Sequence, residues 1–538
     1  MGGLLTVAAA APVSSTALTL ALMLGLAVGI DYALFILSRH RSQLAKGLSP
    51  HESVVSANRT AGSAVVFAGT TVIIALAALS VIGIPFLTVM GLAASGAVLV
   101  AVLVALTLLP ALAGFAGSRL APRPGSRAHR RVTASGAGSV TTSSVDGADA
   151  AGLESMGARW ARLVTARPVV TVLAVAGALA VLAIPTASMR MALPDNGSAA
   201  VGSGQRQAYD TIAERFGPGF NGPLVVVVDS GGDAKAPALV AETVRKLPNV
   251  AYVAPPQPTQ RAGQSLIMVV PKTAPESGQT AELVHAIRDR VPAAVPAAEV
   301  AVTGDTAVTI DVSQRLSASL LPFLAIVVGL SLVLLVVVFC SIAVPVKAAL
   351  SFLLSVAAAL GTTVAVFQWG WAAELFGVAK VGPMVSFLPI ILVGVLFGLA
   401  MDYEVFLVSG IREQWLHDGD AQAAIVEGTR HNARVVTAAA TIMVVVFASF
   451  VPTDDAMIKP IAFALAVGVL VDAFAVRLTL VPAVLALLGR AAWWLPRRLD
   501  RVLPTLNIEG DELSPPRVPP RTAPRTPARD GVPVASTR

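Results

Sequence analysis

Long apolar runs are the feature of this sequence that most restricts its possible folds. Each run holds about 20 residues, enough for a helix that crosses the hydrocarbon core of a bilayer. Of the 538 residues, 55% are hydrophobic and only 13% are charged, whereas soluble proteins carry about 25% charged residues. The sequence therefore predicts a polytopic α-helical membrane protein with about nine spans. The expected spans lie at about residues 14–38, 62–82, 86–115, 167–187, 319–342, 345–369, 383–409, 434–452 and 460–489.

The distribution of basic residues predicts how these spans are oriented. Lys and Arg gather in alternate connections, for example at 39–59 and 490–501, while the connections at 83–85 and 453–459 carry little excess positive charge. Basic connections mark the cytoplasmic side of a membrane protein. We therefore expect the N-terminus outside the cytoplasm and the C-terminus inside.

One sizeable segment between the spans has the pattern of a folded α/β domain. From residue 224 onward its strand and helix patterns follow the order β-α-β-β-α-β, which is typical of a ferredoxin-like domain. The predicted organisation has six parts: transmembrane helices of a first half at 12–118, a flexible cytoplasmic linker at 119–160, a transmembrane helix at 161–189, the extracytoplasmic α/β domain at 190–317, transmembrane helices of a second half at 318–490, and a basic, proline-rich, disordered cytoplasmic tail at 491–538.

Two Asp-Tyr pairs lie inside apolar runs, Asp31-Tyr32 and Asp402-Tyr403. A carboxylate at membrane depth is costly and usually marks a function. The pairs belong to a longer internal repeat at an offset of 371 residues, in which the serines and arginines that follow also match. Parallel repeats of this kind are common in transporters. The repeat predicts two pseudo-symmetric halves with one carboxylate in each.

Three long blocks carry a family resemblance: GIDYALFILSRHR, SIAVPVKAALSFLLSVAAALGTTVAVFQWGW and SFLPIILVGVLFGLAMDYEVFLVSGIREQW. They resemble the MMPL family of the RND superfamily, which are bacterial envelope exporters, and the resemblance covers about residues 12–490. It implies an RND-type fold with a porter-type α/β domain, in which the spans here correspond to helices four to twelve of a twelve-helix template. On that template the first three helices and the first extracytoplasmic domain are absent, so the sequence resembles a truncated member.

The resemblance also implies a proton relay at Asp31, Tyr32, Asp402 and Tyr403. The alternative is that the aspartates only hold their helices together through hydrogen bonds. Further candidates for supporting the relay share a polar side chain within an apolar run; they are Asp472, Arg477, Thr70 and Thr441.

These supporting candidates have alternative explanations. A spacing of five residues is poor for a bond within one α-helix, so we expect Asp472 and Arg477 to reach neighbouring helices, in a structural or a relay role. Thr70 and Thr441 either face the aspartates or bond to their own backbone carbonyls, which is the commoner case. Glu404 has Ala33 as its counterpart in the repeat and no evident role.

The expected function is export of hydrophobic or amphiphilic substrates (lipids, glycolipids or drugs) across the bacterial inner membrane, driven by the proton-motive force. The expected partners are the bilayer and a lipidic substrate, with protons as coupling ion and no cofactor, metal or nucleic acid. No GxxxxGK[ST] motif for ATP is present, and the single cysteine excludes an intrachain disulfide. Two alternatives remain: a non-transporting remnant or scaffold, and an intramembrane aspartyl protease, which the Asp-Tyr arrangement disfavours.

Overall fold

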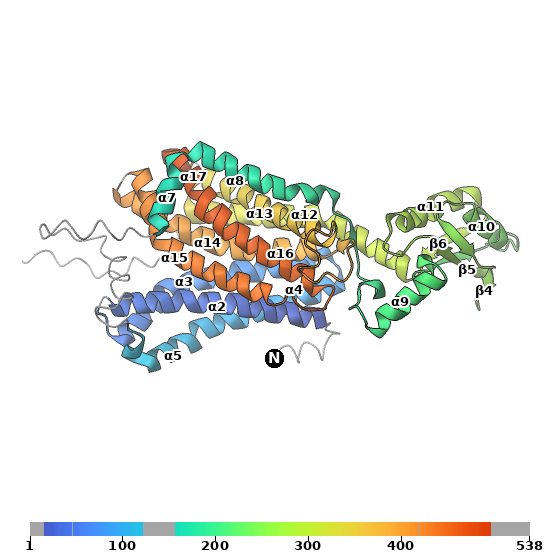
Figure 1. Ribbon diagram of the computed structural model, residues 1–538, viewed down its shortest axis with the longest axis horizontal. Coiled ribbons are helices and arrows are strands. Elements are labelled where there is room, and N and C mark those ends of the chain that lie inside the picture. The colour runs from blue at the N-terminus through green and yellow to red at the C-terminus, as the bar shows by residue number, and fades with distance from the viewer. Residues whose placement is uncertain (1–14, 46, 122–155, 419, 497–538) are drawn as a thin grey trace, which may run out of the picture.

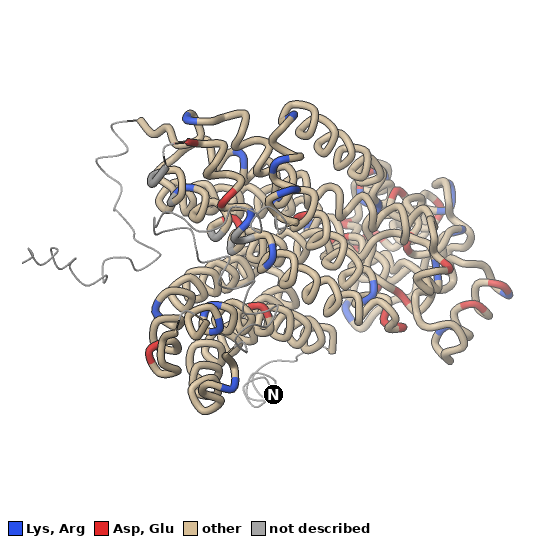
Figure 2. The backbone as a smooth tube through the Cα atoms, turned by 60° about the vertical axis from the view of Figure 1, so that its left-hand side comes forward, with Lys and Arg blue, Asp and Glu red and all other residues tan. Residues whose placement is uncertain are grey.

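A computed structural model describes residues 15–45, 47–121, 156–418 and 420–496, with side chains at most of these positions. The described chain forms a bundle of long helices from one end of which a smaller α/β domain projects (Figure 1). Charged residues gather at the ends of the bundle and over the α/β domain, with few along the length of the helices (Figure 2). This distribution fits a bundle whose middle lies in hydrocarbon.

Eight helical segments among the described residues are long and apolar enough to cross a membrane, and a bent helix pair makes nine. The bent pair is α15, which turns by 46° between Arg430 and Ala433. The predicted spans are therefore confirmed, and the chain is a multi-pass membrane protein. The helices of the bundle are α2 (Ser15–Ala45), α3 (Pro50–Ala77), α4 (Pro85–Leu106), α5 (Leu108–Ala116), α7 (Met156–Ala166), α8 (Pro168–Ala183), α12 (Asp305–Phe339), α13 (Ala343–Phe367), α14 (Leu388–Asp418), α15 (Ala421–Ala448), α16 (Ile458–Leu470), the π-helix η7 (Val471–Leu480) and α17 (Val481–Leu488). Short 3₁₀ turns lie at Ala78–Ile82, Gly117–Leu120, Ile184–Ser188, Asn196–Ser198, Pro218–Asn221 and Gly489–Trp493.

The two Asp-Tyr helices, α2 and α14, occupy equivalent places in the bundle. Within each half, the Asp-Tyr helix packs on the next helix along the chain, α3 or α15. Between the halves the contacts cross over, because α14 packs on α3 and α15 packs on α2. Gly398 makes the α14–α3 contact close, since a Cβ there would lie 2.9 Å from the Cα of Val72. The repeat therefore appears in space as two interlocked halves.

The α/β domain has the ferredoxin-like order predicted from the sequence. Its central sheet runs β3-β5-β2-β6 with antiparallel neighbours, and β4 pairs with β5. In β2 the side chains alternate between buried and half-buried, as a strand with helices on one face requires. The elements are α9 (Gly204–Arg215), β2 (Leu224–Asp229), α10 (Ala236–Arg245), β3 (Val250–Val253), β4 (Gln257–Pro258), β5 (Gln264–Pro271), α11 (Gly278–Ala294) and β6 (Glu299–Thr303).

Two connections join this domain to the bundle. The helix α12 leaves β6 and runs without a break into the membrane part. In addition, β1 (Met191–Ala192) pairs in parallel with β7 (Met384–Val385), a strand just before α14. The second connection fastens the base of the domain to the end of the helix that carries Asp402.

The linker prediction for 119–160 needs one correction. Helix α7 begins at Met156, so the last residues of the expected linker are helical. The helix packs on α15 and α17, and Ala158, Ala161 and Val164 are buried along it. A small apolar stripe with a period of three to four residues explains this packing, although arginines flank it. The stretch 122–155 and most of the predicted tail, 497–538, lie outside the described residues.

Candidate functional site

Asp31 lies near the middle of α2 and is buried in the helix bundle, with 4% of its surface exposed. Its carboxyl group is within hydrogen-bonding reach of Tyr403 and feels the charge of Arg477, both in the second half of the chain. Its neighbour Tyr32 is also buried and packs beside Gly69 of α3. The carboxylate of the first half therefore contacts the tyrosine of the second, across the interface between the repeats.

Asp402 is placed by its backbone within α14, next to Tyr403, but its side chain lies outside what the structure describes. Tyr403 is buried, and the Arg477 guanidinium lies over its ring, 4.8 Å from the centroid. Because of the crossed packing of the halves, the helix turn that bears Asp402 and Tyr403 shares one polar cluster with Asp31. The predicted relay residues thus come from equivalent places on α2 and α14.

Arg477 is the centre of this cluster. It is 3% exposed and forms an ion pair with Asp472. One of its terminal nitrogens also donates to the backbone carbonyls of Ala400, at 2.9 Å, and Leu399, at 3.3 Å. A buried cation needs such partners, because leaving its N–H groups unbonded in apolar surroundings is costly. Arg477 therefore joins η7 to the turn of α14 that precedes Asp402.

Arg477 reaches the neighbouring helix α14, as expected. The expectation that a spacing of five residues prevents a direct bond between Asp472 and Arg477 was wrong, because the two form an ion pair. The reason is the π-helical turn η7, in which backbone bonds run between residues five apart, as from Val481 N–H to the Val476 carbonyl. A residue and its fifth successor then lie almost one above the other. π-Turns are frequent at functional sites, and a sequence argument based on α-helical spacing does not detect them.

Thr70 and Thr441 do not support the relay. Both are exposed on the bundle surface, and each hydroxyl donates to a carbonyl four residues earlier in its own helix, at 2.7 Å. This is the ordinary way in which threonine satisfies its hydroxyl inside an apolar helix. The local alternative for these two residues is confirmed.

The sequence analysis missed a second buried ion pair, between Lys347 of α13 and Glu404 of α14. The side chains are 6% and 7% exposed. Lys347 lies on the second turn of α13 and is buried in the bundle. The sequence did contain a signal for this ion pair. Lys347 is an isolated lysine among apolar residues, and Glu404 is an acidic residue of opposite charge beside the second Asp-Tyr pair.

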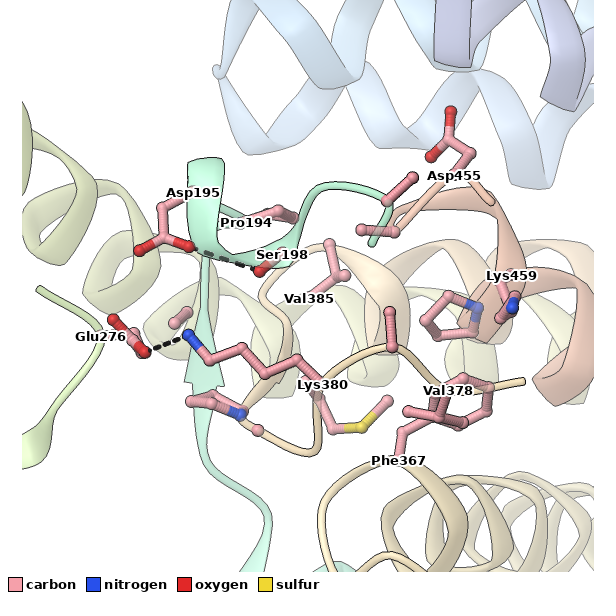
Figure 3. A pocket seen from close by; sticks show the side chains of 18 of the residues that line it. Pro194, Asp195, Ser198, Glu276, Phe367, Val378, Lys380, Val385, Asp455 and Lys459 are labelled. Carbon is pink, nitrogen blue, oxygen red and sulfur yellow. Dashed lines mark hydrogen bonds and ion pairs between the residues drawn. The ribbon is translucent and has the colours of Figure 1, made fainter. Parts of the chain in front are cut away.

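A cavity of about 380 Å³ lies where the α/β domain meets the bundle. Figure 3 shows its mixed wall, with Phe367 and Val385 on the apolar side and charged groups around them. Lys459, at the start of α16, is 7% exposed and donates to the carbonyls of Phe376 and Gly377. The cavity offers both apolar surface and polar groups, as a site for an amphiphilic molecule requires.

A polar cluster closes one side of the cavity, at the seam with the α/β domain. Lys380, from the connection before α14, pairs with Glu276 of the α/β domain at 2.6 Å (Figure 3). Tyr209 of α9 lies against both of these residues. Burial and the nearby Glu276 charge raise the pKa of Asp195. Burial also acts to raise the pKa of Glu276, but the hydrogen bond and charge of Lys380, together with further hydrogen bonds, lower it below its ordinary value. Lys380 therefore ties the connection before α14 to Glu276 of the α/β domain.

Replacing Lys380 by methionine should destabilise this seam by about 1–2 kcal/mol at neutral pH. The pKa of Glu276 lies below its ordinary value of 4.5, so the pair stabilises the fold above that value and loses its effect as the pH falls through the lowered pKa. The difference between the thermal unfolding midpoints of wild type and Lys380→Met should therefore become smaller at acidic pH. Lys246→Met, which breaks an exposed pair with Glu242, is the matched control. If Lys380→Met and Lys246→Met lowered the thermal unfolding midpoint equally at neutral pH, the stabilising role of the Lys380–Glu276 pair would be contradicted.

Among the described residues, no group of three or more His, Cys, Asp or Glu side chains is arranged to hold a metal ion. The described side chains of the membrane cluster offer carboxyl groups, a phenol and a guanidinium. Such a set can take up and release protons and can convert their charge into altered contacts between helices.

Comparison with known proteins identifies similar chains. The profile of the MMPL family matches residues 2–171 and 183–506. The membrane protein YdfJ of Bacillus subtilis is 42% identical over 93% of this chain and 67% of its own length. The heme uptake protein MmpL11 of Mycobacterium tuberculosis is 36% identical over 90% of this chain and 49% of its own length. The mycolic acid-containing lipids exporter MmpL11 of Mycolicibacterium smegmatis is 34% identical over 90% of this chain and 50% of its own length. The chain thus spans about two thirds of YdfJ and about half of the MmpL11 proteins.

Proposed function

The chain belongs to the MMPL family, and from this membership we propose that it moves hydrophobic or amphiphilic molecules outward across the bacterial plasma membrane, driven by protons. It acts as a secondary transporter and not as an enzyme. The burial of Asp31 beside Tyr403 and within the field of the Arg477 charge, across the interface between the repeats, carries the proposal. A carboxyl group between two halves is placed where gain or loss of a proton changes how the halves fit together.

The coupling follows from the crossed packing. With Asp31 charged, its attraction to Arg477 favours the arrangement in which α2 lies against the Tyr403 turn of α14. A proton on Asp31 removes that attraction and favours a second arrangement of the halves. If the proton enters from outside and leaves to the cytoplasm, each cycle can drive one outward movement.

The substrate class is supported by the cavity and by the relatives. The cavity at the base of the α/β domain combines apolar residues with charged and polar ones, which suits a lipid with a polar head. One relative is named an exporter of mycolic acid-containing lipids and another a heme uptake protein; lipids and heme are both amphiphilic. The concentration of basic residues at the connections of one side supports an orientation with that side in the cytoplasm.

Reconstitution tests the proposal. Purified protein in liposomes that contain a fluorescent lipid is expected to release the lipid to an external acceptor faster when a pH gradient is imposed, and a protonophore should remove the acceleration. Protein-free liposomes with the same gradient serve as the control. Lipid release that is unaffected by the gradient would refute proton coupling, and release equal to the protein-free level would favour a scaffold role.

A further inference from the structure

Trp160 connects the cytoplasmic helix α7 to the polar cluster in the membrane. Its indole N–H donates to the backbone carbonyl of Leu478 at 3.0 Å. Leu478 directly follows Arg477 in the π-helix η7. Helix α7 is held close to α15 as well, since a Cβ on Gly157 would lie 3.0 Å from the Cβ of Ala433. The indole is therefore attached to a helix that is itself firmly packed.

Pro482 removes one possible partner of the Leu478 carbonyl within its own helix. In an α-helix a carbonyl accepts from the N–H four residues later, and four residues after Leu478 the chain has a proline, which has no N–H. The proline ring also crowds that carbonyl and pushes it away from the helix axis. The Leu478 carbonyl instead accepts a hydrogen bond from the Trp160 indole of α7.

A second carbonyl of the same stretch is satisfied in a similar way. The Thr479 hydroxyl donates to the Phe474 carbonyl, five residues earlier, at 2.8 Å. Backbone carbonyls in hydrocarbon must find partners, because water is not there to supply them. The wide turn that pairs Asp472 with Arg477 thus depends on donors beyond the regular helix ladder.

We propose that Trp160 is a positioning residue for Arg477: its indole N–H holds the Leu478 carbonyl and so stabilises the π-turn that directs Arg477 toward Asp472 and Asp31. The inference rests on the proposed relay role of Arg477. Trp160 lies more than 300 residues before Leu478 in the sequence, and its hydrogen bond reaches the backbone beside Arg477. On this proposal it acts through the backbone.

The alternative role for Trp160 is that of an interfacial anchor. The side chain is 45% exposed, and tryptophan is enriched where a bilayer meets water. An anchor depends on the aromatic ring, whereas positioning depends on the N–H group. Trp160→Phe keeps an aromatic ring and removes only the donor, so this substitution separates the two roles.

The test measures the carboxyl groups directly and needs no transport. A hydrophobic carbodiimide labels protonated carboxyl groups in membranes, and mass spectrometry reports the labelling of Asp472 and Asp31 against pH. Two further groups influence the titration of Asp472: the charge of Glu404 and the hydroxyl of Ser355. The Trp160→Phe substitution leaves these two groups in place. We expect Trp160→Phe to shift the midpoint of Asp472 labelling to higher pH by at least about half a unit, because Arg477 is then held less firmly beside Asp472.

Trp369→Phe is the matched control, because it removes an indole donor to Ser188 at the other end of the bundle. It should leave the labelling midpoint unchanged. An unchanged midpoint in Trp160→Phe would overturn the proposal and leave the anchor role. If the midpoint shifts while lipid release in wild type shows no dependence on a pH gradient, the positioning inference stands and the proposed function fails.

Pro482→Ala supplies the decisive second variant. Alanine restores an N–H at position 482, so the Leu478 carbonyl gains a partner within its own helix. In that background Trp160→Phe should shift the midpoint much less than it does alone. Equal shifts in both backgrounds would show that Trp160 acts elsewhere than on this carbonyl and would overturn the inference.

Discussion

Replacing Asp31 by asparagine is expected to reduce proton-driven lipid release to the level of protein-free liposomes. Asparagine has nearly the same shape as aspartate and can still form a hydrogen bond with Tyr403, but it cannot carry the charge that attracts Arg477. A ligand or proton can shift two arrangements only through a difference in its interaction with them. Without a titrating group at this position, that difference is lost.

The same substitution should not unfold the protein. Removing a buried charge also removes the cost of burying it, so we expect the thermal midpoint of Asp31→Asn in detergent to stay at or above that of wild type. Thr70→Val, on the helix after Asp31, is the control, since the Thr70 hydroxyl is exposed and bonds only to its own helix. It should transport normally. Normal proton-driven release by Asp31→Asn would disprove the relay role of Asp31.

Much of the architecture was predictable because hydrophobic length and periodicity are local properties of the sequence. The spans follow from apolar runs long enough for a bilayer, and the order of the α/β domain follows from alternating strand and helix patterns. The equivalence of Asp31 and Asp402 follows from the repeat. Each of these inferences compares residues within one segment or between two copies of it.

The parts of the site that were missed depend on contacts between different segments. The π-turn at Asp472 and Arg477 changes the helical spacing itself, and one of its carbonyls, that of Leu478, accepts from Trp160 of α7, more than 300 residues away in sequence. The Lys347–Glu404 pair joins two helices, and neither of these two residues has a charged counterpart in the repeat. The cavity arises only where the α/β domain meets the bundle. None of these has a period or motif that a single segment could show.

Replacing Lys347 by methionine should have the largest effect on stability among the substitutions considered. Methionine fills a similar volume, but Glu404 then remains in the bundle without the Lys347 ammonium group that neutralises it. Breaking a buried ion pair from one side costs about 3–5 kcal/mol. We expect a clear fall in the thermal unfolding midpoint of the purified protein. Lys246→Met, at an exposed pair of the α/β domain, should leave that midpoint nearly unchanged.

The double substitution Lys347→Met with Glu404→Gln should recover most of this loss, because the uncompensated charge is removed as well. It also distinguishes a purely structural pair from one that influences the relay. Glu404 acts on Asp472 through its charge, so the double variant should be stable yet differ from wild type in the pH dependence of proton-driven lipid release. An unaltered pH dependence in a stable double variant would show that the pair only holds α13 to α14. If the double variant were as unstable as Lys347→Met, the loss of stability would come from altered packing and not from an unpaired charge. That result would contradict a stabilising role of the ion pair.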